Sequence, residues 1–216
     1  DGPAGAGKST IARMLARELN YIYVDTGAMY RAMALYMIEH KIDVSHLDEV
    51  GSACDAITID IQYSAGEQQV ILNGKNVNDF IRTETVSEMS SKISAIPEVR
   101  EKLLSLQRSL AAAENVIMDG RDIGTHVLPN ADVKIFLTAD VHVRAVRRYE
   151  EFIAKGVSCT LENVEREVIE RDERDMNRAI APLKQAEDAV RVDTSAMTIE
   201  EVVCYLKNLI GQAVAR

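Results

Sequence analysis

The first ten residues carry the clearest chemical pattern in the chain. Residues 2–9 follow the spacing Gly-x4-Gly-Lys-Ser of a Walker A loop, and Gly5 adds a third glycine. Glycines let a loop turn its backbone N–H groups inward around phosphate oxygens, and the positive end of the following helix points at the same anion. We therefore expect Lys8 to bridge the outer phosphates of a nucleoside triphosphate and the Ser9 hydroxyl to ligate Mg²⁺.

The whole loop is expected to bind ATP. Its residues are Gly2, Pro3, Ala4, Gly5, Ala6, Gly7, Lys8, Ser9 and Thr10. The alternative is a glycine-rich turn that only starts a helix. A Walker A loop follows a buried strand, whereas this sequence begins at Asp1. We expect the natural chain to extend upstream and to supply that strand as the central one of its sheet.

A second cluster begins at Asp25, directly after a short apolar segment. Asp25 or Thr26 can cap a helix, and Arg31 lies about one turn into that helix, within reach of an anion at its start. The alternative for Arg31 is a solvated surface residue.

A third cluster covers residues 119–125 and follows the apolar segment 116–118. Ligands of open α/β sheets bind at the carboxyl ends of the strands. We expect Arg121 to bind a phosphate group through its forked N–H donors and Asp122 to accept a hydrogen bond from an exocyclic amino group. Asp119 has two alternative roles: it orients water molecules on Mg²⁺, or it caps the turn after its strand.

A fourth cluster occupies residues 171–178, near the end of a predicted helix. Its members recur at spacings of three and four residues, so we expect them to share one helix face. They are Arg171, Arg174, Asp175 and Arg178. The alternative is an exposed face with ion pairs, each worth about a few tenths of a kcal/mol. Phosphoryl transfer needs charge neutralisation around the moving group, which favours the functional interpretation.

The distribution of charge indicates a small anionic ligand. The 216 residues carry a formal net charge of -9, whereas a nucleic-acid binder typically has a basic domain or stripe, so no nucleic-acid partner is expected. Seven of the 16 arginines nevertheless lie between Arg144 and Arg178. An acidic chain with one arginine-dense segment favours recognition of a compact anion.

The remaining reactive residue types suggest no competing site. The histidines have neither metal-site nor catalytic-triad spacing. They are His40, His46, His126 and His142. The cysteines Cys54, Cys159 and Cys204 are far apart, which suits a reducing cytosol, so a cytoplasmic location is expected. The apolar runs are much shorter than the roughly 20 residues that cross a bilayer, and no membrane partner is expected.

The periodicity of apolar residues predicts the scaffold that positions these clusters. Helices are predicted over residues 8–19, 28–40, 98–113, 141–155, 162–180 and 199–214. Short apolar runs predict strands over residues 21–24, 116–118, 133–137 and 190–192. Helices that separate buried parallel strands are typical of a doubly wound α/β fold.

One region departs from this alternation. Residues 57–63 and 69–72 alternate like strands joined through residues 64–66, and an Asn73-Gly74 turn follows. We expect a small antiparallel insert that projects from the core near the substrate. The alternative is a hairpin without a role in binding. No repeat or flexible linker is visible, so residues 1–216 are expected to form one domain.

Four motifs together resemble the bacterial cytidylate kinase family of nucleoside monophosphate kinases. They are Gly-Pro-Ala-Gly-Ala-Gly-Lys-Ser-Thr at 2–10, Asp-Thr-Gly-Ala-Met-Tyr-Arg at 25–31, Gly-Arg-Asp-Ile-Gly-Thr at 120–125 and Arg-Asp-x-x-Asp-x-x-Arg at 171–178. Ala-Pro-Leu at 181–183, Ala-Glu-Asp-Ala at 186–189 and Val-Asp-Thr at 192–194 are also similar to that family. The order and spacing of these motifs make the resemblance specific.

The resemblance implies a P-loop kinase core with a five-stranded parallel sheet, a nucleotide-monophosphate-binding insert over about residues 53–95 and a mobile helical lid over about residues 148–178. It also implies the substrate contacts. Ser91, Arg100 and Asp122 would contact cytosine. Arg171 and Asp175 would hold the ribose. Arg31, Arg121 and Arg178 would bind the acceptor phosphate. Ser91 and Arg100 are placed by the similarity of residues 95–100 to the stretch before the family's long helix.

We therefore interpret the chain as a kinase that transfers the γ-phosphoryl group of ATP to CMP or dCMP in pyrimidine nucleotide metabolism, giving CDP or dCDP and ADP. Lys8, Mg²⁺ on Ser9 and the lid arginines Arg174 and Arg178 would stabilise the transferred group. One alternative is a kinase for UMP, AMP or a non-nucleotide alcohol, although a carboxylate at Asp122 suits the amino group of cytosine better than the carbonyl of uracil. Another is a regulatory P-loop module without transfer activity. A monomer is expected.

Overall fold

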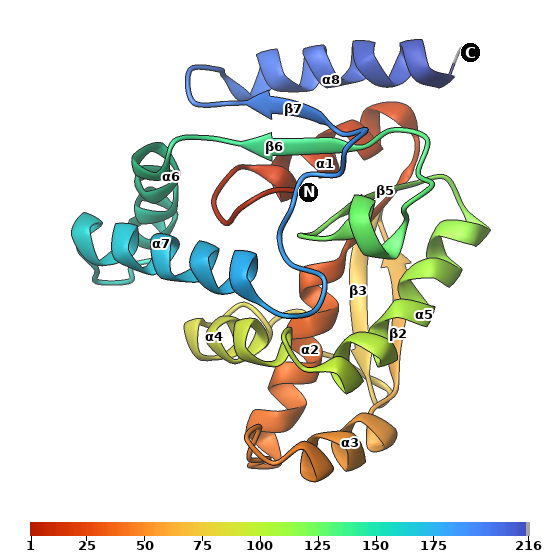
Figure 1. Cartoon of the computed structure of the whole chain (residues 1–216), viewed down its shortest axis with the longest axis vertical. Coiled ribbons are helices and arrows are strands. Elements are labelled where there is room, and N and C mark those ends of the chain that lie inside the picture. Colours follow the sequence, from red (N-terminus) through yellow and green to blue (C-terminus); the bar gives the residue numbers. More distant parts are fainter. Residues whose placement is uncertain (215–216) are drawn as a thin grey trace. The chain divides into compact units, whose positions relative to one another are not determined.

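The computed structural model describes residues 1–214, and strands and helices alternate along much of this range (Figure 1). The chain folds into two compact units. Unit 1 comprises Asp1–Leu15 and Gly120–Arg216, and unit 2 comprises Ala16–Asp119. Parallel strand pairs and helices occur in both units, so the predicted mixed α/β class is confirmed.

Helix α2 (Thr26–Glu39) forms the centre of unit 2. Its side chains are apolar around most of the helix, as expected for a helix buried in a core. Met29, Met33 and Met37 are each 0% exposed. A fully buried side chain of this size stabilises a fold by roughly 1.5–3 kcal/mol, so this helix is a strong anchor for the residues at its start.

The other elements of unit 2 pack around α2. Strands β1 (Ile22–Asp25) and β5 (Val116–Asp119) form a parallel pair in which Asp25 lies opposite Asp119. Three further helices are α3 (Leu47–Ala56), α4 (Glu84–Ile93) and α5 (Pro97–Ala113). All three contact α2, which places the end of β1 and the start of α2 beside a rigid core.

An antiparallel sheet lies where alternation predicted a hairpin. It consists of β2 (Ile59–Ser64), β3 (Glu67–Leu72) and β4 (Lys75–Asn76) in that order. Ala65 and Gly66 both have positive φ, at 52° and 78°, which is the backbone of a tight two-residue hairpin turn. Alternate residues of β3 are buried, so one face of the hairpin packs on the core of unit 2.

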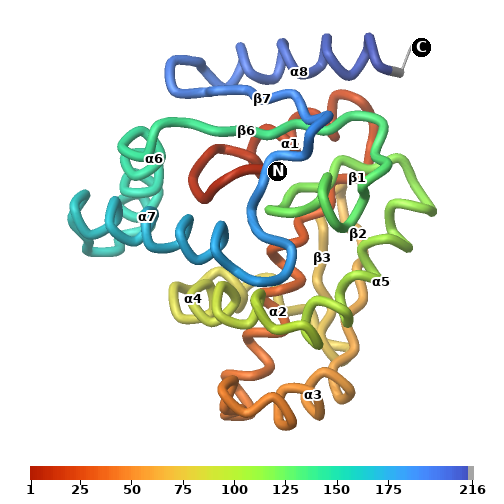
Figure 2. Tube along the Cα trace, viewed as in Figure 1, coloured from red at the N-terminus to blue at the C-terminus, as the bar shows by residue number. Residues whose placement is uncertain are grey.

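Unit 1 contains a second parallel pair, β6 (Ile135–Thr138) and β7 (Val190–Asp193). Helices α6 (Val141–Ala154) and α7 (Leu161–Asn177) lie side by side as a helical hairpin (Figure 2). The remaining elements are α1 (Lys8–Leu19), the π-helical turn η1 (Ile123–Val127) and α8 (Ile199–Val214). The chain passes from unit 1 to unit 2 within α1.

Several predicted boundaries are wrong. Helix α7 ends at Asn177 instead of residue 180, because Arg178 already has an extended backbone with φ -64° and ψ 142°. The strand predicted over residues 133–137 begins at Ile135. Helices α3 and α4 and the turn η1 were not predicted. Each is ten residues or shorter, which leaves little room for a helical period to be recognised.

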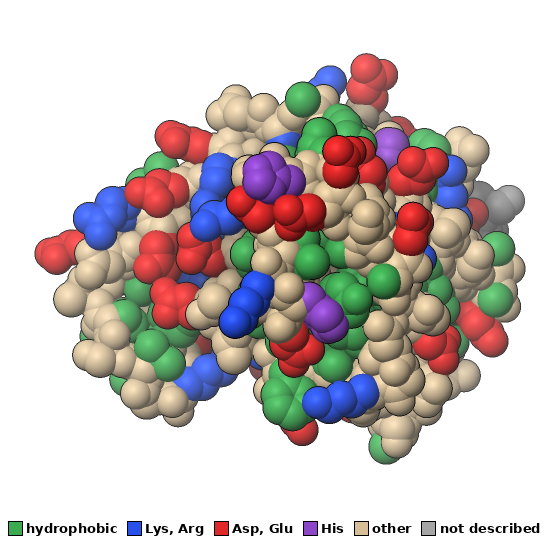
Figure 3. Space-filling model, turned by 90° about the horizontal axis from the view of Figure 1, so that it is seen from below, with side chains coloured by type: hydrophobic (Ala, Val, Ile, Leu, Met, Phe, Trp, Pro, Cys, Tyr) green, Lys and Arg blue, Asp and Glu red, His purple; other side chains and the backbone are tan. Residues whose placement is uncertain are grey.

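The surface carries charges of both signs. On the face shown in Figure 3, acidic and basic side chains lie in small groups among hydrophobic and uncharged ones. This mixed pattern differs from the basic stripe of a nucleic-acid-binding surface. Over residues 1–214, the structure has no helix with both the length and the apolar character needed to span a membrane.

Candidate active site

The Walker A loop, residues 2–10, adopts a backbone that requires its glycines. Gly2 has φ 143°, and a Cβ atom there would lie 1.9 Å from the carbonyl oxygen of Leu137. Gly5 and Gly7 have φ 73° and 86°, in the left-handed region that glycine adopts readily. The loop therefore passes close to β6 and turns directly into α1, as the Walker A pattern predicts.

Asp1 anchors the start of this loop. Its amino group donates to the carbonyl oxygen of Ile135 at 2.8 Å, and its carbonyl oxygen accepts from the Leu137 N–H at 2.8 Å. This is the bonding pattern of a residue paired in parallel with β6. Its carboxylate also accepts from the N–H groups of Ile123 and Gly124, at 2.9 and 2.8 Å. The loop is thus tied to β6 and to η1.

Lys8 lies within the loop. Its side chain is largely shielded, with 9% of the residue exposed, and Nζ donates to the carbonyl oxygen of Pro3 at 2.6 Å. Ser9 and Thr10 are exposed on the first turn of α1. Mg²⁺ prefers oxygen ligands, and beside nucleotide phosphates it takes few of them from the protein. A hydroxyl at the start of this helix can be one of these ligands. Within residues 1–214, no group of three or more His, Cys, Asp or Glu side chains is arranged to hold a metal ion.

Two acid–arginine pairs bring together four of the predicted substrate-binding residues of unit 1. Arg121 Nε donates to Asp175 Oδ2 at 2.9 Å, and Arg178 Nη2 donates to Asp122 Oδ1 at 3.1 Å. The side chains of the second pair are only 5% and 7% exposed. Both pairs join the segment after residue 119 to the carboxyl end of α7, so two guanidinium groups and two carboxylates are held within one small region.

The helix face predicted for residues 171–178 is wrong only at Arg178, because α7 ends at Asn177. Asp175 is buried, Arg171 is half-buried and Arg174 is exposed. Arg178 lies beyond the helix, and its Nε donates to the carbonyl oxygen of Ala181 at 2.7 Å. The inward face of α7 consists of Val164, Val168, Asp172 and Asp175. Its last turns therefore present carboxylates to the interior of unit 1.

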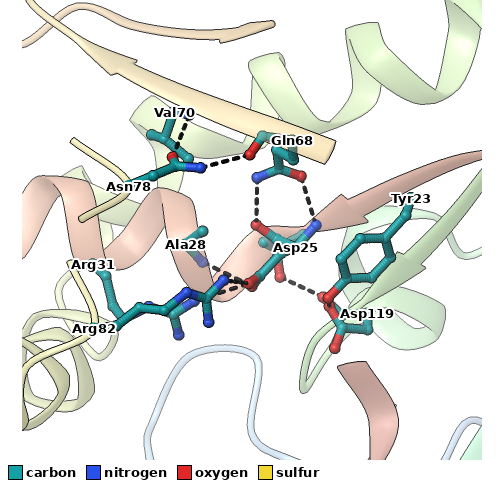
Figure 4. A network of polar contacts seen from close by, with 10 residues as sticks. Tyr23, Asp25, Ala28, Arg31, Gln68, Val70, Asn78, Arg82 and Asp119 are labelled. Atoms are coloured by element: carbon teal, nitrogen blue, oxygen red, sulfur yellow. Dashed lines mark hydrogen bonds and ion pairs between the residues drawn. The ribbon is translucent and has the colours of Figure 1, made fainter. Parts of the chain in front are cut away.

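In unit 2, a polar network surrounds the carboxylate of Asp25 (Figure 4). Asp25 caps α2 by accepting from the Ala28 N–H at 2.9 Å. Arg31 and Arg82 both donate to its Oδ2, at 2.9 and 3.3 Å. Gln68 holds the backbone of Asp25 through two further hydrogen bonds. The predicted cap is thus Asp25, and the predicted site residue Arg31 is fixed at the start of α2.

The surroundings of Asp25 control its ionisation. Burial by itself raises the pKa of this carboxyl, but the charges of Arg31 and Arg82 and the hydrogen bond from Ala28 outweigh burial and bring the pKa below its ordinary value. Asp25 is therefore ionised at neutral pH. Two guanidinium groups beside one carboxylate leave an excess of positive charge at the start of α2.

Asp119 also belongs to unit 2. Its carboxylate accepts from the Tyr23 hydroxyl at 3.2 Å, and its carbonyl oxygen accepts from the Thr26 hydroxyl at 2.7 Å. The residue is buried at the end of β5, opposite Asp25. These contacts link the two parallel strands of unit 2 at their carboxyl ends.

Ser91 and Arg100 lie near one end of α4. Arg100 Nη1 donates at 3.0 Å to the carbonyl oxygen of Ser94, the residue that caps α4, and its guanidinium lies 5.8 Å from the ring centre of Tyr30. The Ser91 hydroxyl is shielded from solvent and makes no hydrogen bond within the described part of the chain. A buried hydroxyl of this kind is costly unless a ligand or water molecule satisfies it.

Sequence reasoning missed three contributors to the Asp25 network. Gln68 points to the same face of β3 as the buried Val70 and Leu72. A polar residue on an otherwise apolar strand face could have indicated a role for Gln68 from the sequence. Asn78 donates to the Gln68 carbonyl oxygen at 2.7 Å and thereby supports it. Arg82 precedes the Thr83 cap of α4, and nothing local marks it as a partner of Asp25.

The glycine loop with its lysine, in an α/β chain with arginine–carboxylate pairs, defines a P-loop nucleotide-binding protein. The family model described as Cytidylate kinase matches residues 1–212. The chain belongs to the cytidylate kinase family, and the prediction of an ATP-dependent nucleoside monophosphate kinase is confirmed.

Curated relatives carry the same name over nearly the full length of the chain. A cytidylate kinase of Carboxydothermus hydrogenoformans is 50% identical over 98% of this chain and 96% of its own. Those of Lactobacillus johnsonii and Bacillus cytotoxicus are 48% and 45% identical, over 97% and 100% of this chain and 91% and 96% of their own. The likeness therefore extends well beyond the Walker A loop.

Proposed function

We propose that the protein transfers the γ-phosphoryl group of ATP directly to the phosphate of CMP, and also of dCMP, giving CDP or dCDP and ADP. The observation that carries this proposal is the buried pair of Asp122 and Arg178, which joins a carboxylate to a guanidinium at 3.1 Å. A carboxylate accepts hydrogen bonds from the amino group of cytosine, and a guanidinium binds phosphate.

On the donor side, residues 2–10 would bind the phosphates of ATP through their backbone N–H groups. Lys8 would exchange its present hydrogen bond with the Pro3 carbonyl oxygen for oxygens of the outer phosphates. Ser9 would contribute a hydroxyl ligand to Mg²⁺. The ion would supply charge neutralisation when it is bound with ATP, and Mg²⁺ commonly takes its other ligands from water and phosphate.

On the acceptor side, each unit would contribute its own residues. Unit 1 would contribute Arg121 and Arg178 to the phosphate, Arg171 and Asp175 to the ribose, and Asp122 to the base. Unit 2 would contribute Arg31 to the phosphate and Ser91 and Arg100 to the base. The shielded, unsatisfied hydroxyl of Ser91 supports its assignment, because a cytosine ring can complete its hydrogen bonding.

The chemistry would depend on position and charge. The acceptor phosphate oxygen is already anionic near neutral pH, so the reaction needs no general base. Lys8, Arg174 and Arg178 would stabilise the charge on the transferred group. Residues 148–178 would act as a lid that excludes water, and Arg174 is free to approach the nucleotide because it is exposed on α7. Residues 53–95 would act as the acceptor-binding insert.

The remaining parts of the proposal concern the assembly of the fold and the setting of the protein. The parallel pairs β1–β5 and β6–β7 would belong to one five-stranded sheet, and Asp1 supports a fifth strand because it pairs in parallel with β6. Residues 1–216 would act as one kinase domain and as a monomer. A reducing cytoplasm suits the free thiols of Cys54, Cys159 and Cys204.

An acceptor series tests this proposal. ADP release is measured with ATP, Mg²⁺ and each of CMP, dCMP, UMP, AMP and GMP. The proposal requires kcat/KM to be highest for CMP and dCMP. A preference for UMP or AMP would retain the kinase and overturn the cytosine assignment of Asp122. Failure to release ADP with any nucleotide would overturn the proposed transfer.

A further inference from the structure

A buried ion pair holds the phosphate-binding loop by its backbone at Ala4. Asp172 Oδ1 accepts from the Ala4 N–H at 3.2 Å, and Arg144 Nη1 donates to the Ala4 carbonyl oxygen at 2.9 Å. The same Arg144 nitrogen donates to Asp172 Oδ2 at 2.5 Å, and its Nε donates to the carbonyl oxygen of Ala139 at 2.9 Å. The pair therefore binds both polar backbone groups of one loop residue.

The burial of this pair requires an explanation beyond stability. Arg144 and Asp172 are each 4% exposed. Replacement of a buried ion pair by apolar side chains of similar size is often neutral or stabilising, because desolvation of two charges offsets much of their attraction. A buried pair is useful where it must satisfy other polar groups, and here the N–H and C=O of Ala4 are those groups.

The next loop residue reinforces the same contact. A Cβ atom at Gly5 would lie 3.0 Å from the Arg144 carbonyl oxygen and 3.1 Å from its Cβ atom. The loop thus packs directly against the backbone of α6. Its conformation is set by α6 through packing and by α6 and α7 through the ion pair.

We propose that Arg144 and Asp172 are positioning residues that hold the phosphate-binding loop in the conformation that binds ATP. Both side chains act on the loop through the backbone of Ala4. By fixing Ala4 they orient the backbone N–H groups of the residues that follow it. A misplacement of about 1 Å is enough to cost on the order of 100-fold in a catalytic site. This inference rests on the proposed function only in that residues 2–10 bind the phosphates of ATP.

The ion pair also fixes one residue of α7, Asp172, to the loop. Asp172 lies within residues 148–178, the segment proposed as a lid, yet its carboxylate is bonded to the loop. Closure of that segment would therefore leave Asp172 itself in place. The loop and the base of the lid form one structural element in unit 1.

The test compares three variants of the full chain with the unmodified protein. Asp172→Asn removes the charge, and the double variant Arg144→Met with Asp172→Leu replaces the pair by apolar side chains. Glu165→Gln is the matched control. Glu165 also joins α7 to α6, through His142 at 3.1 Å, but these side chains are 32% and 60% exposed and are not the hydrogen-bond partners of Ala4. The readouts are ATP affinity by titration calorimetry, the KM values of both substrates and the thermal unfolding midpoint.

Loss of loop positioning predicts a specific combination of results. Asp172→Asn and the double variant should bind ATP at least about tenfold more weakly, with the KM for CMP within about twofold of the unmodified value. The double variant leaves the N–H and C=O of Ala4 without these partners, so its unfolding midpoint should fall, and its ATP affinity is measured at a temperature where it is still folded. Glu165→Gln should change neither affinity nor stability appreciably.

Two outcomes would overturn the inference. Normal ATP affinity in the double variant, measured where it is folded, would show that the pair does not position the loop for ATP. Equal weakening in Glu165→Gln would assign the effect to general contact between α6 and α7. Lys8→Ala separates this result from the proposed function: if it weakens ATP binding while the double variant does not, only the positioning role fails. Unchanged ATP affinity in Lys8→Ala would instead overturn the assignment of the loop.

Discussion

The Walker A loop of unit 1 and the Asp25 network of unit 2, which are both proposed to bind anions, are built in different ways. The loop uses backbone N–H groups, and three glycines with positive φ give it its shape. The Asp25 network uses side chains from β1, α2, β3 and the segment before α4, with a buried carboxylate at its centre. The glycines of the first arrangement can be recognised locally in the sequence, although the loop is also held by Arg144 and Asp172, whereas the second arrangement depends on tertiary contacts throughout.

This difference separates the expected consequences of substitution. Lys8 belongs to neither the apolar core nor the ion pair that holds the loop, so its loss should lower activity and leave the fold. Asp25 pairs with two arginines and caps α2, so its loss should weaken the fold as well. Substitution of Lys8 is therefore expected to lower mainly activity, and substitution of Asp25 is expected to lower stability as well.

The largest effect is expected for Lys8→Ala. Removal of one preorganised positive group from the transferred phosphate should lower kcat by on the order of 100- to 1,000-fold. Stability should fall by only about 1 kcal/mol, the typical contribution of a hydrogen bond such as that from Lys8 Nζ to the Pro3 carbonyl oxygen. Steady-state kinetics and urea unfolding measure the two quantities. Retained activity would contradict the assigned role of the loop.

A smaller effect on selectivity is expected for Asp122→Asn. An amide can donate a hydrogen bond to the carbonyl of uracil, whereas the carboxylate accepts from the amino group of cytosine, so the preference for CMP over UMP should fall by about 10- to 100-fold. Because Arg178 is bonded to Asp122, the KM for CMP should also rise. The KM for ATP serves as the internal control and should stay nearly constant. An unchanged CMP-to-UMP ratio would remove Asp122 from the base-binding site.

The Asp25 network makes a prediction about pH. The pKa of the Asp25 carboxyl is lower in the folded protein than its ordinary value. The ionised carboxylate therefore stabilises the fold above about pH 4, and this stabilisation is lost as the pH falls through the pKa of the folded state. Asp25→Asn should destabilise the protein by about 1–3 kcal/mol at pH 7. The difference should shrink as the pH falls below about 4. Urea unfolding at a series of pH values measures it, and a difference independent of pH would exclude a charged Asp25.

The smallest effect is expected at an exposed ion pair of the same unit. Arg17 and Glu67 are in contact, with side chains 64% and 41% exposed. Arg17→Met should change the free energy of unfolding by less than about 0.5 kcal/mol, because solvent screens such pairs. The measurement uses the conditions of the Asp25 series at pH 7. A loss as large as that of Asp25→Asn would contradict the special role given to the buried carboxylate.

The sequence predicted local features well and tertiary partners poorly. The Walker A loop, α1 and the hairpin follow from glycine spacing and apolar periodicity, which act over a few residues. Arg82 and Gln68 were missed as partners of Asp25, because 57 and 43 positions separate them from it along the chain. The end of α7 was misjudged because the backbone at Arg178 is extended while its guanidinium binds Asp122 and Ala181.

Transfer of a labelled γ-phosphoryl group tests the central claim most directly. The protein is incubated with γ-labelled ATP, Mg²⁺ and CMP, and the products are separated. Direct transfer between the two nucleotides predicts that the label appears in CDP as fast as ADP forms, with none on the protein. Label in inorganic phosphate or on the protein, or ADP formation that does not depend on CMP, would contradict it.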